Sequence, residues 1–119
     1  MNLKDIICDF EYADRLAELG ISRESLFGFC NDKRSVSFAH KPHVSLNSYT
    51  VAELGEMLAS EHIDNYLYCD LFTEKEEHFY SCGYEGTVVC RDKKEANARA
   101  KLLIWLIENN HVNVEELNK

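Results

Sequence analysis

The chain has 119 residues, which is the length of one ordinary domain. Hydrophobic residues make up 45% of it and charged residues 29%, a balance that indicates a globular protein and excludes disorder as the main state. Thirteen Lys and Arg against 21 Asp and Glu give a formal net charge of −8, so we do not expect a surface that binds the phosphates of duplex nucleic acid.

The first predicted helix begins after Asp9, a residue favoured at the N-cap, and carries apolar residues at helical spacing over residues 13–19. Gly20 can adopt the left-handed conformation that ends a helix, and Ile21 then falls where it can contact Leu16. These residues predict a Schellman motif at the end of this helix.

The second predicted helix has a capping box, because Thr50 and Glu53 stand three residues apart before an apolar stripe. Tyr49 and Leu54 occupy the two positions of a hydrophobic staple. Gly55 lies beside the stripe although glycine weakens a helix, which indicates either that another backbone comes close to it or that a weak helix is tolerated here.

The third predicted helix starts at Asp92, with Glu95 as the acidic residue three positions later, and extends to about residue 108. It is apolar around most of its circumference, so we expect it to be buried on more than one side. Asn113 can cap a last short turn over residues 113–118. One apolar face holds Ala96, Ala100, Leu103, Ile104 and Ile107, and a second holds Ala98, Leu102 and Trp105.

Strand-like segments lie between these helices. Residues 26–30 and 35–40 flank a polar turn, and Pro42 ends the second of them. Residues 66–72 and 78–84 flank a charged loop over 73–77, and residues 87–90 add a fifth strand. The predicted fold is α+β, a single domain over residues 1–119 in the order α-ββ-α-βββ-α. In it an antiparallel sheet of four to five strands has helices packed mainly on one face.

The five cysteines (Cys8, Cys30, Cys69, Cys82 and Cys90) are odd in number and contain no C-x-x-C pair. We therefore expect small buried thiols rather than a disulfide framework or a zinc ribbon. The longest apolar run, residues 102–107, is far shorter than the roughly 20 residues of a membrane span, and no signal peptide is evident at the start. These features predict a cytoplasmic protein.

The sequence contains none of the established catalytic or nucleotide-binding motifs, so we predict no catalytic residue, cofactor or metal. His40 and His43 are too isolated from other ligand types to form a metal site without a special turn. An enzyme that uses Asp70, His78 or Cys82 is the weakest alternative, because these residues fit no known spacing.

Two surfaces are candidates for binding a protein. The first is the second face of the last long helix, with Ala98, Leu102 and Trp105, which would serve a partner or a homodimer. The second is a row of tyrosines in the paired strands, which either forms an aromatic contact patch or lies under a helix. This row consists of Tyr66, Tyr68, Tyr80 and Tyr84.

A group of cations near the start of the last long helix is a weak candidate for an anion site. Arg91, Lys94 and Arg99 could hold the phosphates of a nucleotide beside the helix N-terminus. Asp92 and Glu95 compete at the same place, so a solvated helix start is the more ordinary interpretation.

Three segments of the chain resemble short, uncharacterised open reading frames of bacteriophages, prophages and gut bacteria. They are LAELGI at residues 16–21, SYTVAELGEML at 48–58 and EANARAKLLIWLIENN at 95–110. The resemblance carries no catalytic motif and implies only a setting, that of an accessory protein of a mobile element inside a bacterial cell. Some small acidic proteins of that setting inhibit host defence.

The leading hypothesis from the sequence is therefore a non-enzymatic, acidic binding module that acts through protein–protein contacts, with inhibition of host defence as one candidate role. We expect a homodimer, an unidentified protein partner, and no contact with duplex nucleic acid or membrane. The alternative is a protein that binds or sequesters a small ligand such as a nucleotide.

Overall fold

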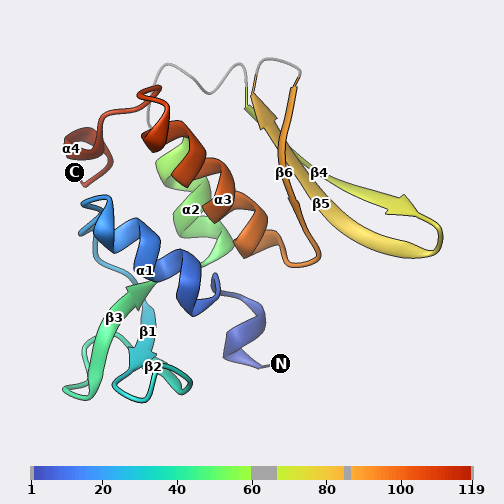
Figure 1. The fold of residues 1–119 in the computed structure, drawn as a ribbon. Helices are drawn as coiled ribbons and strands as arrows, with labels where there is room; N and C mark the ends of the chain where they lie inside the picture. The colour runs from blue at the N-terminus through green and yellow to red at the C-terminus, as the bar shows by residue number, and fades with distance from the viewer. Residues whose placement is uncertain (1, 60–66, 85–86, 119) are drawn as a thin grey trace.

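The computed structural model describes residues 2–59, 67–84 and 87–118, with only the backbone at positions 67 and 68. Within these ranges a layer of helices lies between two separate three-stranded antiparallel sheets (Figure 1). The elements are η1 (Leu3–Asp5), α1 (Phe10–Glu18), β1 (Phe27–Cys30), β2 (Val36–Phe38), β3 (Val44–Ser48), α2 (Val51–Ala59), β4 (Leu67–Glu74), β5 (Glu77–Tyr84), β6 (Thr87–Asp92), α3 (Glu95–Glu108) and α4 (Val114–Leu117).

The first sheet has the strand order β2-β1-β3, so β1 is its centre. Gly28 stands in the middle of β1, opposite Ser37 on one side and Asn47 on the other. A Cβ at this position would lie 2.5 Å from the backbone oxygen of Leu46 and 2.6 Å from Val44 Cγ1. The close packing of β3 on β1 therefore requires a glycine here.

The second sheet has the order β4-β5-β6, and all its pairs are antiparallel. The β4–β5 hairpin closes through a two-residue turn, Lys75 and Glu76, whose φ angles are +52° and +68°. Two consecutive left-handed residues define a type I′ turn, which matches the twist of the flanking strands. The strands of the hairpin consequently continue through most of the segment that the sequence predicted as a charged loop.

Helix α3 forms the centre of the molecule, because it contacts α1, α2, β5 and β6. Its residues from both predicted apolar faces are buried, as expected for a helix with little polar surface. None of the helices in the described ranges, α3 included, has the length and apolar character needed to cross a bilayer. The buried α3 residues are Ala96, Asn97, Ala98, Ala100, Leu102, Leu103, Leu106 and Ile107.

The prediction of one sheet with four to five strands was wrong. Six strands form in the described ranges, and they divide into two sheets, one of β1, β2 and β3 and the other of β4, β5 and β6. Strand β3 (Val44–Ser48) was not predicted, because it follows Pro42, is only five residues long and holds only two apolar residues. Strand β2 ends at Phe38, so Pro42 lies beyond it in the turn that leads to β3.

The predicted helix ends are largely confirmed. Gly20 has a φ of +101°, and the Ile21 amide donates to the Leu16 carbonyl at 3.0 Å, which is the Schellman geometry. The capping box is present in both directions, from the Glu53 amide to Thr50 Oγ1 and from the Thr50 amide to Glu53 Oε1. The last short turn is also present as α4, which is capped by the side chain of its preceding asparagine.

Three local predictions about helix neighbours need correction. The Asp9 side chain makes no capping hydrogen bond, because it is used by residues of α3. Helix α3 begins at Glu95, and Asp92 Oδ1 accepts from the Lys94 amide one turn before it. The close neighbour of Gly55 is a side chain, since a Cβ there would lie 2.9 Å from Arg99 Nη1.

Candidate protein-interaction site

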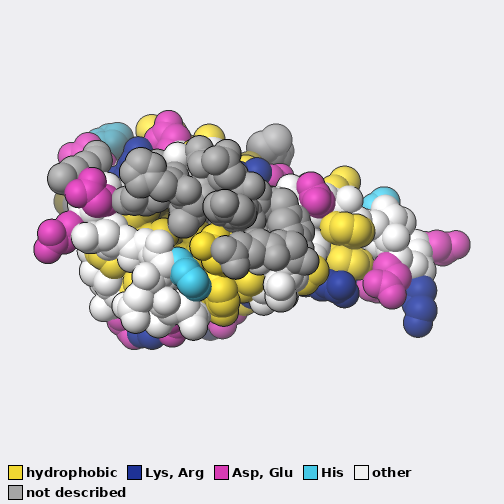
Figure 2. All heavy atoms as spheres, turned by 90° about the horizontal axis from the view of Figure 1, so that it is seen from above, with side chains coloured by type: hydrophobic (Ala, Val, Ile, Leu, Met, Phe, Trp, Pro, Cys, Tyr) yellow, Lys and Arg dark blue, Asp and Glu magenta, His cyan; other side chains and the backbone are white. Residues whose placement is uncertain are grey.

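The hairpin of β4 and β5 projects away from the helical layer, and its distal half has no helix beside it (Figure 1). Residues 70–78 are all exposed, although they form eight-residue strands with regular pairing. Two large apolar side chains lie on this projection, Leu71 with 58% and Phe72 with 47% of their surface exposed. Figure 2 shows hydrophobic atoms on the narrow projection, with charged side chains toward its end.

The two apolar side chains point to opposite faces of the hairpin, since neighbouring residues of a strand alternate. Phe72 stands opposite Phe79, and their rings stack with centroids 6.1 Å apart. The guanidinium of Arg91, from β6, lies over the Phe79 ring at 5.2 Å. Leu71 stands on the other face, opposite Tyr80. Both faces of the hairpin therefore offer apolar surface.

The hairpin is strongly acidic. Between residues 69 and 84 it carries four carboxylates (Asp70, Glu74, Glu76 and Glu77) against the single ammonium of Lys75. Lys93 approaches Glu77 at 3.8 Å, but both side chains are largely exposed, so this pair contributes little stability. The hairpin thus combines apolar side chains with a negative field at its end.

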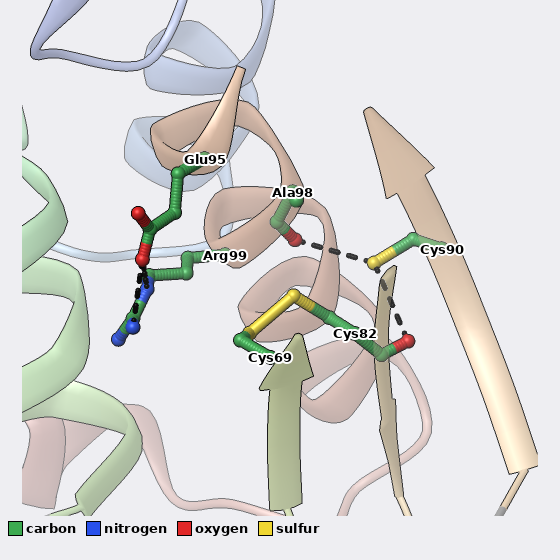
Figure 3. Close-up of a disulfide and its surroundings, with 6 residues drawn as sticks. All are labelled: Cys69, Cys82, Cys90, Glu95, Ala98 and Arg99. Carbon is green, nitrogen blue, oxygen red and sulfur yellow. Dashed lines mark hydrogen bonds and ion pairs between the residues drawn. A yellow bond between two sulfur atoms is a disulfide. The ribbon is translucent and has the colours of Figure 1, made fainter. Parts of the chain in front are cut away.

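A disulfide joins the two strands at the base of the projection. Cys69 and Cys82 stand directly opposite each other in the register, with Cα atoms 4.2 Å apart, and their sulfurs are bonded (Figure 3). The expectation that all five cysteines are thiols was therefore wrong for this pair. Cys8, Cys30 and Cys90 are free thiols, and the first two are buried as expected.

Cys90 lies beside the disulfide, because it is the β6 partner of Cys82. Its Sγ lies 3.2 Å from the Ala98 carbonyl oxygen of α3, to which it donates (Figure 3). Burial raises the pKa of Cys90 to about 11, although the nearby ammonium of Lys101 opposes this shift. The thiol is therefore protonated at neutral pH and a poor nucleophile.

The predicted partner face on α3 is mostly inside the molecule. Ala98 and Leu102 have no exposed surface. Trp105 is partly buried, and its ring lies 6.0 Å from that of Tyr84 and 5.1 Å from that of His111. Among the described residues of that face, only Trp105 retains surface for a partner.

The predicted tyrosine row is not one continuous surface. Tyr66 lies outside the described residues, and Tyr68 is described only by its backbone, opposite Gly83 in β5. Tyr80 and Tyr84 are partly buried and share a face with Cys82, which α3 covers completely. The part of the row that the structure describes therefore lies mainly under a helix, and Tyr84 joins the aromatic cluster of Trp105.

The three candidate anion-binding cations do not converge. Arg91 lies on the Phe79 ring, Arg99 pairs with Glu95 at 2.9 Å, and Lys94 Nζ pairs with Asp9 at 2.6 Å. Lys94 does line an open groove of about 510 Å³ at the starts of α2 and α3. The groove is lined by Asp5, Ile6, Thr50, Val51, Ala52, Tyr80, Lys93, Lys94 and Glu95, so cations and carboxylates share its wall.

Asp70, His78 and Cys82, the residues of the enzyme alternative, do not come together in one site. The Cys82 sulfur is in the disulfide, and Asp70 belongs to the opposite face of the sheet. His78 Nδ1 lies 2.9 Å from Thr73 Oγ1 on the exposed hairpin. The His40 ring packs against Phe38, and no cluster of three or more potential metal ligands occurs in the described ranges.

A polar network that the sequence did not reveal joins the start of α1 to α3. The buried Asn97 accepts from the Asp9 amide at 2.7 Å and donates to the Asp9 carboxylate at 2.9 Å. Burial alone would raise the pKa of Asp9, but the hydrogen bonds from Lys94 and Asn97 outweigh it, so this pKa lies below its ordinary value. Because every member is paired within the chain, we interpret the network as structural.

Comparison with protein-family models, with curated proteins and with solved structures finds no match for this chain.

Proposed function

We propose that this protein is a non-enzymatic binding module that acts through protein–protein contacts, and that the β4–β5 hairpin is its contact element. The observation that carries the proposal is the exposure of Leu71 and Phe72 on the distal half of the hairpin, where residues 70–78 are all exposed. An isolated two-stranded hairpin is at best marginally stable in water, and ordering each residue costs about 1–2 kcal/mol. A projection that buries little of its own apolar surface therefore suits contact with another molecule.

Three features support the hairpin over the other exposed apolar positions. Its distal half extends away from the described helices, it offers apolar groups on both faces, and a disulfide holds its strands together at the base. A preorganised element loses less conformational entropy on binding than a flexible one. Phe38, which is 51% exposed on the first sheet, instead packs against the rings of Phe27 and His40.

The resemblance to reading frames of phages and prophages suggests, as part of this proposal, where the protein acts. In that setting the binding module acts inside a bacterial cell, and a protein of host defence is a candidate partner. The acidic charge of the hairpin suits a partner with a basic surface, since opposite potentials steer two proteins together and favour the correct pairing.

Binding of a nucleotide is the second function that the sequence left open, and the structure supports it less. Of its three cations, only Lys94 lines the groove at the helix starts, and its ammonium is already paired with Asp9. Calorimetry with a panel of nucleotides decides this alternative, because the absence of heat with every nucleotide would remove it.

Site-specific photo-cross-linking in bacterial cells tests the proposed function. A benzoylphenylalanine is placed at Phe72, and a matched control carries it at Phe38, which has similar exposure on the other sheet. We expect a discrete adduct from position 72 and none from position 38, and its mass shows whether the partner is another protein or a second copy. No adduct at position 72, or equal adducts at both positions, would contradict the proposal.

A further inference from the structure

Strand β4 is an edge strand, because within the described residues it pairs only with β5. The turn residues Lys75 and Glu76 form a type I′ turn, which makes Glu74 and Glu77 a hydrogen-bonded pair. Hydrogen-bonded and non-hydrogen-bonded pairs alternate along an antiparallel ladder. Main-chain groups of β4 at every second position, including Leu71, therefore point away from β5.

The disulfide supports this assignment independently. Cys69 and Cys82 have Cα atoms 4.2 Å apart, close to the spacing of about 4.5 Å for a non-hydrogen-bonded pair. Leu71 and Thr73 lie two and four residues farther along β4, so they too belong to non-hydrogen-bonded pairs with β5. Their N–H and C=O groups, together with those of Cys69, form the free edge of the sheet.

Three of the usual protections of a free edge, a lysine, a proline and a bulge, are absent from β4. Its sequence LYCDLFTE contains no lysine and no proline, and its register with β5 has no bulge. The only irregularity in this sheet lies between β5 and β6, at Cys82 and Gly83. An open edge of this kind is a ready template for pairing with a strand of another molecule.

The charges of the edge favour a basic occupant. Asp70, Phe72 and Glu74 share one face of β4, so two carboxylates flank one aromatic ring. Leu71 and Thr73 lie on the opposite face. A second copy of this chain would bring four more hairpin carboxylates and a further net charge of −8 to the same edge, which opposes pairing.

We propose that an extended, basic segment of a partner protein adds to the β4 edge as a fourth strand of this sheet. Its main chain pairs with Cys69, Leu71 and Thr73, and its lysine or arginine side chains stand opposite Asp70 and Glu74. Apolar side chains of the segment cover Leu71 and Phe72 on the two faces. This inference rests on the proposed function, because it assigns the partner's chemistry to the same hairpin.

The probe for this proposal is a synthetic peptide with the core Lys-Val-Val-Val-Lys, whose second and fourth residues pair with Thr73 and Leu71 when the peptide adds antiparallel to β4. A control peptide, Lys-Pro-Val-Pro-Lys, has the same charge but lacks the two amides that would pair with the edge. Amide hydrogen exchange is measured by NMR on the intact protein. With the first peptide at saturation we expect exchange of the Leu71 and Thr73 amides to slow at least tenfold, and no such change at Asp70 and Phe72.

A pair of variants provides a second measurement. Leu71→Pro removes the outward N–H and leaves the bonds to β5 in place, whereas Leu71→Ala removes only the side chain. We expect the proline variant to bind the first peptide at least tenfold more weakly than the alanine variant. Equal affinities of the two variants would overturn strand addition.

The outcomes separate this inference from the proposed function. Peptide binding without protection of the Leu71 amide, or equal protection by both peptides, overturns edge pairing but leaves the hairpin as a contact element. If the first peptide does not bind, the proposal that a basic segment pairs with the β4 edge is wrong. Protection that arises without peptide and grows with protein concentration shows a second copy on the edge and also overturns it. A missing Phe72 adduct in cells would contradict the proposed function itself.

Discussion

Replacing Leu102 by alanine tests whether α3 is the core of the monomer or part of an interface. Leu102 has no exposed surface and stands in the helix that contacts α1, α2 and the second sheet. Truncating a fully buried leucine costs about 2–5 kcal/mol, through lost transfer free energy and the cavity left behind. For 119 residues the total stability is on the order of 6–18 kcal/mol, so this loss is a large fraction of it.

Urea unfolding followed by circular dichroism measures the effect. With a loss of about 3 kcal/mol and an m-value of about 2 kcal/mol/M, the midpoint falls by about 1.5 M. Leu71→Ala is the matched control, since Leu71 is 58% exposed and its variant should stay within about 0.5 kcal/mol of the parent. If Leu102→Ala leaves the midpoint unchanged but dissociates a dimer, the helix face is an interface, and the assignment to the core is refuted.

Three further predictions concern features of the interior. Asn97→Ala leaves the Asp9 amide without its partner and should cost about 1–3 kcal/mol in urea unfolding. Because the pKa of Asp9 is lowered in the folded chain, its carboxylate stabilises the fold at pH values above its unfolded pKa, and this stabilisation is lost as the pH falls through the folded pKa. The same variant should therefore unfold in acid at a higher pH. An unchanged acid midpoint would contradict this. Replacing Cys69 and Cys82 by alanine removes a cross-link that closes a 14-residue loop. The free energy of unfolding, measured by thermal unfolding, should fall by roughly 3 kcal/mol. An unchanged melting temperature would argue against the disulfide. Gly28→Ala should prevent β3 from packing on β1, seen as a loss of soluble folded protein; a variant with parental stability would disprove the close approach.

The sequence identified those parts of the fold that depend on local contacts. The capping box at Thr50, the left-handed Gly20 and the buried circumference of α3 each need only residues a few positions apart or within one helix. Their physical basis is backbone hydrogen bonding at helix ends and the helical period, both of which can be identified directly in a sequence.

Pairing between distant segments could not be predicted in the same way. Whether six strands form one sheet or two depends on which edges meet, and neither β-propensity nor alternation carries that information. The contacts of Asn97 with Asp9, 88 positions away, likewise depend on the packing of α1 against α3. Strand β3 was missed although Val44 and Leu46 alternate with Ser45 and Asn47, because a five-residue segment with two apolar residues carries only a weak strand signal.

The candidate site was only partly accessible to sequence reasoning. The paired strands around residues 73–77 were predicted, but a five-residue loop leaves the register open. A two-residue turn at Lys75 and Glu76 would have placed Cys69 opposite Cys82, because both are equally distant from the turn. Leu71 and Phe72 are exposed because none of the described helices or strands packs over the distal hairpin, which no residue pattern in the strand itself reveals.

The central claim is that the distal half of the hairpin, with Leu71 and Phe72, binds a partner and contributes little to the stability of the fold. The most direct measurement compares the parent with a double variant, Leu71→Ser with Phe72→Ser, for both the free energy of unfolding and the yield of partner adduct. For cross-linking, both chains carry the photoreactive residue at His78, an exposed position of the distal hairpin. We predict an unfolding free energy within about 1 kcal/mol of the parent and loss of the adduct. A variant that keeps the full adduct, or that loses it only because it no longer folds, would contradict the claim.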